Sequence, residues 1–244
     1  MNGFEKNFSV CYHDLKNNMY VKEAKIIDFL QETAVFHSEY AGFEINRFIE
    51  ENKGWMVTDW DIRINTPLKW NDTLRVHTYP IIFKGILAKR GFYAYNAGGD
   101  VVLTAASRWA FTDLIKRRPT KIWKEMETAY GYFEPSPFET EYLQPYEDTE
   151  GLEYLGSFSH TVTRRDTDTN DHVNNVSYFE WAADNFPDDI YNNMNAKHIM
   201  VKYKKECTLG AKVTIKTYRK NNETVTYIYN EEDILINRIY VLWE

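Results

Sequence analysis

The chain has 244 residues, with 29 lysines and arginines against 36 acidic residues, and a formal net charge of −7. This balance argues against nucleic-acid binding, which needs a basic surface, and two cysteines, Cys11 and Cys207, are too few for a disulfide framework. No apolar run approaches the roughly 18 residues of a membrane span, and the N-terminal residues lack a secretion signal, so we expect a cytoplasmic protein.

The first half predicts one long helix followed by several strands. Ile26, Leu30, Thr33 and His37 follow helical spacing over residues 22–42, and Gly42 is a natural stop. Apolar and polar residues alternate from residue 56 to residue 64, so that positions 56, 58, 60, 62 and 64 share a face. Residues 71–79, 92–96 and 101–105 show the same strand pattern.

Residues 134–151 form the clearest change in composition. This segment holds three of the seven prolines and six acidic residues but no lysine or arginine, which is typical of an extended linker. We therefore expect one domain over residues 1–133 and a second over residues 152–244.

The two predicted domains resemble each other. Residues 10–18 are similar to 162–170 at an offset of 152, residues 71–79 to 210–218 at an offset of 139, and residues 95–103 to 229–236. In the second half a helix is expected from residue 173 or 174 to residue 185, ended by Pro187. The prediction is an α+β fold of two units, each a long helix packed on an antiparallel sheet, with the two sheets pairing edge to edge.

The strongest chemical signal lies just before this second helix. Asp168, Asn170 and His172 alternate, so in an extended segment their side chains point the same way. The helix start at Val173 and Asn174 offers N–H groups that can bind a carbonyl and stabilise an oxyanion. The plainer interpretation is that these polar residues only cap the helix.

A second candidate is Glu206 with Cys207, expected at the start of the next strand. A glutamate among apolar strand residues is costly unless it is paired or functional. It is either an edge residue paired with Lys204 or Lys205, or a catalytic acid. Cys207 is a candidate nucleophile if His172 lowers its pKa, and otherwise a buried core residue.

The repeat indicates that the titratable set occurs only once. In the first half, Lys16, Asn18, Tyr20, Pro67 and Leu68 stand at the positions of Asp168, Asn170, His172, Glu206 and Cys207. A purely structural set would tend to appear in both copies, so this pattern favours a single active site in the second half.

At this point the sequence resembles the acyl-acyl carrier protein thioesterases of plants and bacteria, which are tandem hotdog folds. The resemblance rests on Leu30-Gln31-Glu32-Thr33-Ala34 with His37, Trp55-x-Val57-Thr58, Pro67-x-x-Trp-Asn-Asp72, Ala105-Ala106-Ser107-x-Trp109, the string from Asp168 to Tyr178, and the Lys-Lys-Glu-Cys ending at Cys207. Plant members carry arginines where this chain has Lys204 and Lys205. The chain also lacks their N-terminal transit region, which favours a bacterial cytoplasmic enzyme.

The resemblance implies hydrolysis of fatty acyl-carrier thioesters to free fatty acid and carrier thiol, which ends chain elongation, with neither a cofactor nor a metal. It places Asp168, Asn170 and His172 on the catalytic loop and makes Glu206 the second acid. Glu206 and His172 would share acid–base work, Asn170 would position substrate or water, and Asp168 would orient His172 or attack directly. Cys207 matches a cysteine once proposed as the nucleophile.

The implied substrate predicts two further features. An apolar tunnel is expected in the first half, with Trp55, Val57 and Trp60 as candidate walls. An acidic carrier protein needs a local basic patch on this acidic chain. The candidates are Arg164-Arg165, Lys202-x-Lys204-Lys205 and Arg117-Arg118-x-x-Lys121, with a solvated face as the plainer interpretation.

Three other functions stay open from the sequence. They are an acyl-CoA thioesterase with the same chemistry, a hotdog hydratase or dehydratase, and a non-catalytic acyl-binding module. A homodimer of the tandem chain is also possible, while a nucleic-acid partner is not expected.

Overall fold

The computed structural model describes residues 3–131, 134–138, 146–169 and 172–244. The strands are β1 (Phe4–Ser9), β2 (Lys53–Ile64), β3 (Thr73–Lys84), β4 (Leu87–Tyr95), β5 (Val101–Asp113), β6 (Arg118–Pro119), β7 (Glu153–Thr161), β8 (Ala196–Tyr203), β9 (Lys212–Lys220), β10 (Glu223–Asn230) and β11 (Leu235–Trp243). The helices are α1 (Glu23–Tyr40), α2 (Ile45–Glu50), α3 (Lys124–Ala129), α4 (Asn175–Ala183) and α5 (Asp188–Tyr191), and η1 (Tyr12–Asp14) is a single 3-10 turn.

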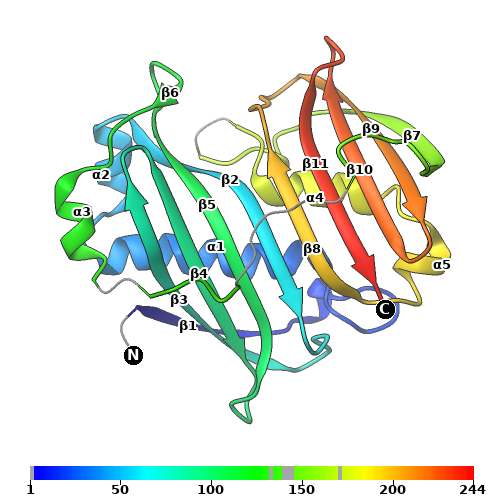
Figure 1. Cartoon of the computed structure of the whole chain (residues 1–244), viewed down its shortest axis with the longest axis horizontal. Coiled ribbons are helices and arrows are strands. Elements are labelled where there is room, and N and C mark those ends of the chain that lie inside the picture. Colours follow the sequence, from blue (N-terminus) through cyan, green and yellow to red (C-terminus); the bar gives the residue numbers. More distant parts are fainter. Residues whose placement is uncertain (1–2, 132–133, 139–145, 170–171) are drawn as a thin grey trace.

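The strands of the described residues form one antiparallel sheet with internal symmetry. Its order is β1-β3-β4-β5-β2-β8-β11-β10-β9-β7, with β6 pairing beside β5. The second half of this order repeats the first half in reverse, so β2 of one unit and β8 of the other meet in the middle (Figure 1). The predicted edge-to-edge pairing of two α+β units is confirmed.

The pairing of β2 with β8 locates the centre of this symmetry. Asp61 pairs with Met200, and these two residues are separated by 139, the offset that relates the two copies in this region. Trp60 and Ile62 pair with Val201 and Ile199 on either side of them. All four of these apolar side chains are buried in one core cluster, so the two units share a single core.

Helices α1 and α4 both lie behind the sheet in Figure 1 and contact each other. Buried residues of α1, including Ile26, Ile27 and Leu30, recur at helical spacing and face the shared core. The chain leaves α1 through Gly42, whose positive φ of 83° is the left-handed conformation that glycine adopts without a Cβ clash. No helix in the described ranges is long and apolar enough to span a bilayer.

A bulge in β2 changes the alternation predicted for residues 56–64. The register of β2 against β5 shifts between Val57 and Asp59. As a result Val57 joins Trp60 and Ile62 in the core, although the sequence pattern placed position 57 on the opposite face from 60 and 62. The single uninterrupted alternation is therefore wrong, because one extra residue in a strand inverts the face of all that follow.

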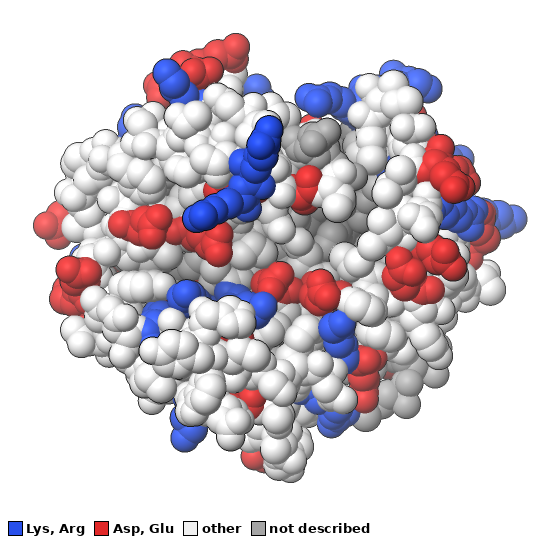
Figure 2. Space-filling model, turned by 180° about the vertical axis from the view of Figure 1, so that it is seen from behind, with Lys and Arg blue, Asp and Glu red and all other residues white. Residues whose placement is uncertain are grey.

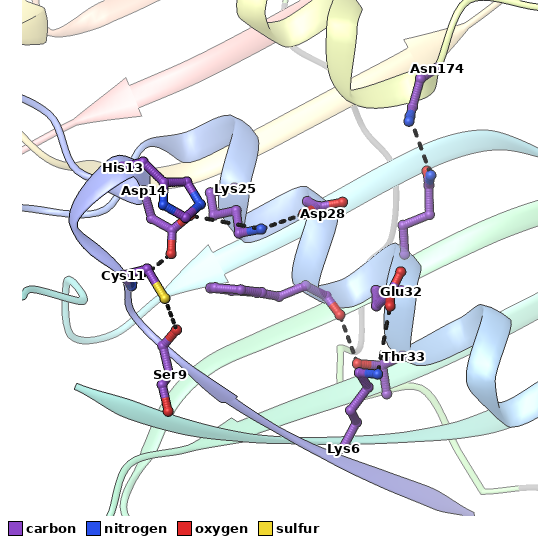
Figure 3. Close-up of polar contacts among 12 residues, drawn as sticks. Lys6, Ser9, Cys11, His13, Asp14, Lys25, Asp28, Glu32, Thr33 and Asn174 are labelled. Atoms are coloured by element: carbon purple, nitrogen blue, oxygen red, sulfur yellow. Dashed lines mark hydrogen bonds and ion pairs between the residues drawn. The ribbon is translucent and has the colours of Figure 1, made fainter. Parts of the chain in front are cut away.

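The loop that precedes each main helix has the same hydrogen bonds in both units. Asp14 accepts a hydrogen bond from the Cys11 N–H at 2.8 Å, as Figure 3 shows, and Asp166 accepts one from the Thr163 N–H at 2.6 Å. Lys16 N–H donates to the Tyr20 carbonyl at 2.8 Å, just as Asp168 N–H donates to the His172 carbonyl at 2.8 Å. The backbone is thus repeated where the side chains differ.

The described parts of the predicted linker pack on the face of the sheet that lies away from α1 and α4 (Figure 1). The Arg63 guanidinium lies 3.8 Å from the centre of the Phe138 ring. The Tyr227 hydroxyl donates to the Tyr146 and Asp148 carbonyls at 3.1 and 2.8 Å. The segment therefore covers part of the sheet.

Candidate active site

The candidate site is built where the loop before α4 meets the loop after β8. Val173 N–H donates to the Cys207 carbonyl at 2.9 Å, and His172 forms an isolated β-bridge with Thr208. These contacts fix His172 next to Glu206. Glu206 lies in the loop between β8 and β9, so its predicted place at the start of a strand is wrong.

His172 and Glu206 approach each other directly. The His172 Nε2 atom lies 3.4 Å from Glu206 Oε2. The histidine side chain is 9% exposed and the glutamate side chain 31%, so one partner is shielded while the other reaches solvent. His172 Nδ1 is buried and has no hydrogen-bond partner among the described residues. An imidazole paired with a carboxylate in this way can accept and return a proton.

Asp168 lies on the same loop at the mouth of a cavity. Its Oδ1 accepts a long hydrogen bond of 3.4 Å from the His172 N–H, and its backbone N–H bonds the His172 carbonyl. The side chain is thereby held beside His172 while remaining exposed. The third member of the predicted loop set, Asn170, lies outside the described residues.

The predicted oxyanion donors at the helix start are wrong. Val173 N–H already donates to the Cys207 carbonyl, and Asn174 N–H donates to the Asp166 carbonyl at 2.7 Å. The Asn174 side chain instead caps α4 by accepting from the Val176 N–H at 3.1 Å. These N–H groups hold the loop in place and are not free for a substrate carbonyl.

Cys207 is buried, with 6% of its surface exposed. Burial raises the pKa of its thiol, a backbone hydrogen bond opposes this increase, and the charge of Glu231 adds to it. A reactive cysteine needs the opposite environment, because the thiolate is the nucleophile. The environment therefore favours a role for Cys207 as a buried core residue over a role as a nucleophile.

An apolar cavity of about 290 Å³ begins at this loop and extends into the first unit. Asp168, Thr169 and Asn175 line it at the site, and Gln31 lines it from α1. Its further lining includes Ala34, Val35 and Ser38 of α1, Phe43, Ile45, Phe48 and Ile49 around α2, Lys53, Gly54, Trp55 and Met56 of β2, and Phe83, Ala88, Lys89, Arg90 and Trp109 of the neighbouring strands. The cavity is thus lined by one catalytic candidate, Asp168, at the loop before α4 and mostly by side chains of the other copy.

Only one of the three predicted cavity walls lines this cavity. Trp55 does, whereas Val57 and Trp60 do not. Trp60 is fully buried and packs against Phe92 and Trp109, with ring centres 5.3 and 6.1 Å away. The bulge in β2 turns Val57 and Trp60 into the shared core.

The sequence interpretation gave no role to Gln31, which connects the two units at the site. Its Nε2 donates to the Asn174 side-chain oxygen at 3.3 Å, and its Oε1 accepts from the Asn175 side-chain nitrogen at 3.0 Å. Figure 3 shows Asn174 pointing from the second unit toward α1. The only signal in the sequence was that Gln31 belongs to one of the motifs that carried the resemblance.

Comparison with known families fits this architecture. The model of the acyl-ACP thioesterase N-terminal domain matches residues 1–130, and that of the C-terminal domain matches residues 154–244. The chain belongs to the acyl-ACP thioesterase family. A curated relative, the chloroplastic palmitoyl-acyl carrier protein thioesterase of Gossypium hirsutum, is 26% identical over 218 residues. That match covers 84% of this chain and 52% of the relative, so the chain spans about half the length of the relatives it matches.

Solved structures in this family confirm the tandem hotdog fold. An acyl-ACP thioesterase from Bacteroides thetaiotaomicron has a TM-score of 0.84 at 21% identity, covering 98% of this chain and 97% of its own. The 12:0-ACP thioesterase from Umbellularia californica has a TM-score of 0.86 at 18% identity, covering 99% and 96%.

Most of the basic residues that flank the candidate site in the sequence are exposed, and their role in binding a carrier stays a prediction. Arg164, Arg165, Lys204 and Lys205 are exposed, while Lys202 is half-buried. The face in Figure 2 carries basic and acidic side chains interspersed, without one continuous basic area. In the described parts of the chain, no group of three or more histidine, cysteine, aspartate or glutamate side chains is placed to hold a metal ion.

Proposed function

We propose that this chain hydrolyses fatty acyl-acyl carrier protein thioesters to a free fatty acid and the carrier thiol. The observation that carries the proposal is the approach of His172 to Glu206 beside an apolar cavity whose mouth is lined by Asp168. Membership of the acyl-ACP thioesterase family adds to it. A cytoplasmic location and a homodimer stay predictions from the sequence.

The proposed reaction is attack of water on the thioester carbonyl carbon. The His172–Glu206 pair takes a proton from the water as its oxygen bonds to the carbon, and a tetrahedral oxyanion forms. Collapse of this intermediate re-forms the carbonyl and breaks the C–S bond, and the leaving thiolate takes up the proton. Asp168 positions His172 through its backbone N–H, and Asn170 remains the predicted amide that positions substrate or water.

We assign the acyl chain to the cavity between α1, α2 and the sheet. A chain in this cavity places its thioester beside Asp168, and each buried methylene contributes about 0.8 kcal/mol. Gln31 supports this arrangement, because it lines the cavity and also bonds both asparagines at the start of α4.

Single substitutions test the catalytic assignment. His172→Ala and Glu206→Gln should each lower kcat by about 100-fold or more, since general acid–base catalysis contributes about 10²–10⁴-fold. Cys207→Ala should stay within about threefold of the parent. Tyr20→Phe is the matched control, because Tyr20 stands at the position of His172 in the other copy. An inactive Cys207→Ala together with a fully active Glu206→Gln would refute the assignment.

The carrier partner is proposed from the exposed basic residues around the site. Reversing the charge of Arg164 and Arg165 should raise KM for acyl-carrier thioesters, and rising salt should do the same. Lys69→Glu is the control, because Lys69 is an exposed lysine beside Tyr20 in the copy without the titratable set. Equal kcat/KM on acyl-CoA and acyl-carrier thioesters, with no dependence on salt, would favour the acyl-CoA alternative.

A further inference from the structure

Two neighbouring turns of the first unit expose large apolar side chains. The turn between β3 and β4 carries Ile86 and Leu87, which are 40% and 47% exposed, and the turn between β5 and β6 carries Ile115, which is 73% exposed. The Phe111 N–H of β5 donates to the Ile86 carbonyl at 2.9 Å, so the β3–β4 turn is bonded to the strand that leads into the β5–β6 turn. Apolar side chains that are exposed together, rather than singly, mark an interaction surface.

The same two turns carry only positive charge. Residues 84–87 and 114–121, which we call the two-turn surface, contain five lysines and arginines, all exposed, and no acidic residue, although the whole chain has a net charge of −7. In the described parts of the chain, no carboxylate lies within ion-pair distance of Arg117, Arg118 or Lys121. These three cations are therefore available to an anionic partner.

The two-turn surface adjoins the wall of the cavity that we assign to the acyl chain. Phe83 and Ala88, on either side of residues 84–87, line this cavity, and so does Lys53, which pairs with Asp113 at the base of the β5–β6 turn. Figure 1 shows β6 and its turn projecting at the upper left, beyond the rest of the first unit. A partner on this surface would therefore lie at the end of the molecule that holds the cavity.

We propose that the two-turn surface docks this protein on an anionic lipid bilayer. Exposed aliphatic side chains enter the headgroup region of a bilayer while lysines and arginines contact the lipid phosphates, and the combination holds peripheral proteins on membranes. A bilayer yields to a projecting turn, whereas a folded partner must offer a matching pocket. The exposed Ile115 beside Arg117 and Arg118 therefore favours lipid over the carrier protein, for which these arginines were candidates from the sequence.

The inference goes beyond the proposed function, and its test uses no substrate. The whole chain is sedimented with vesicles made of equal parts of phosphatidylglycerol and phosphatidylcholine, or of phosphatidylcholine alone. It should bind the first and not the second, and rising salt should weaken the binding. Arg117→Gln/Arg118→Gln should weaken it about 25-fold, at about fivefold per cation. Lys69→Gln/Lys212→Gln is the control, because it removes the same charge from exposed positions outside the two-turn surface.

The apolar part of the surface has its own test. Ile115→Ser should weaken vesicle binding about tenfold, since an isoleucine side chain loses its burial in the bilayer. Leu209→Ser is the matched control, because Leu209 is 52% exposed and lies in the second unit. A fluorophore on Ile115→Cys in a Cys11→Ser background should shift its emission to the blue on anionic vesicles, while the buried Cys207 stays unlabelled.

Three results would overturn the proposal. They are no binding of the unmodified protein to anionic vesicles, binding that Arg117→Gln/Arg118→Gln and Ile115→Ser both leave unchanged, and an unshifted fluorophore at position 115. A higher KM for acyl-carrier thioesters in Arg117→Gln/Arg118→Gln, with unchanged vesicle binding, would identify a carrier site and equally overturn it. The comparison of the two vesicle types needs no variant, so a variant that does not fold leaves the proposal open to refutation.

Discussion

Lys16 occupies the position of Asp168 in the other copy, and there it forms a buried ion pair. Its Nζ lies 2.7 Å from Glu23 Oε1, and the two side chains are 0% and 3% exposed. The same Nζ donates to the Met194 carbonyl at 3.1 Å, which connects the first unit to the second. We predict that Lys16→Met strongly destabilises the fold although Lys16 is not part of the proposed catalytic set.

The magnitude follows from the charge left behind. Removing one partner of a buried pair leaves an uncompensated charge and costs about 3–5 kcal/mol. Burial already raises the pKa of Glu23 against the opposing charge of Lys16. Without Lys16, the carboxyl should take up a proton more readily. A buried carboxyl with a raised pKa is tolerated at low pH, where it is protonated, and destabilises the fold as the pH rises and it ionises. The loss of unfolding free energy in Lys16→Met should therefore be larger at pH 8 than at pH 5.

The assay is urea unfolding followed by tryptophan fluorescence, which the seven tryptophans make practical. The double variant Lys16→Met/Glu23→Leu removes both charges and should recover most of the lost free energy of unfolding. Two results would refute the reasoning. One is a fall of less than about 1 kcal/mol in the free energy of unfolding of Lys16→Met, and the other is a double variant that is no more stable than Lys16→Met.

Three further predictions concern the site. Burial of Cys207 and exposure of Cys11 predict that an alkylating reagent modifies Cys11 quickly and Cys207 only on unfolding, as mass spectrometry of the labelled peptides would show. Asp166→Asn should lower the free energy of unfolding by about 1.5–3 kcal/mol, because the Asp166 carboxylate accepts hydrogen bonds from several donors, including the Trp181 indole at 3.0 Å. Burial raises the pKa of Asp166, but these hydrogen bonds lower it on balance. The stabilisation by Asp166 should therefore disappear as the pH falls below 3.8, the ordinary pKa of an aspartate, and denaturation at falling pH would show this loss. Gln31→Leu should lower stability by about 1–2 kcal/mol through two lost hydrogen bonds and also reduce kcat/KM, whereas an effect on stability alone would argue against its role at the site.

Most of the fold could be predicted because its signals are local. The helix expected over residues 22–42 is α1 over Glu23–Tyr40, and the helix expected to start at residue 173 or 174 begins at Asn175 after its cap. The repeat predicted two similar α+β units whose sheets pair edge to edge, as β2 and β8 do. The β2 bulge could not be predicted, because an extra residue in a strand is visible only against its neighbour.

The candidate site was predictable in its residue types but not in its hydrogen bonds. The single set of Asp168, His172 and Glu206 could be identified by comparing the two copies. The N–H of Val173 is used by the Cys207 carbonyl, a partner more than thirty residues away in the sequence. The role of Gln31 likewise depends on how α1 and α4 pack together, which no local pattern records.

The pairing of β2 with β8 joins the two units of one chain, and this affects which side chains each unit carries as well as the shape of the sheet. Two separate chains of one kind would associate as equals, each with the same pocket and the same reactive loop. Because the two units belong to one chain, every molecule contains one copy of each unit, and a mutation can change one unit without changing the other. The first unit has at the position of Asp168 a lysine, Lys16, that bonds to the second unit, while the second unit has the residues of the proposed catalytic set.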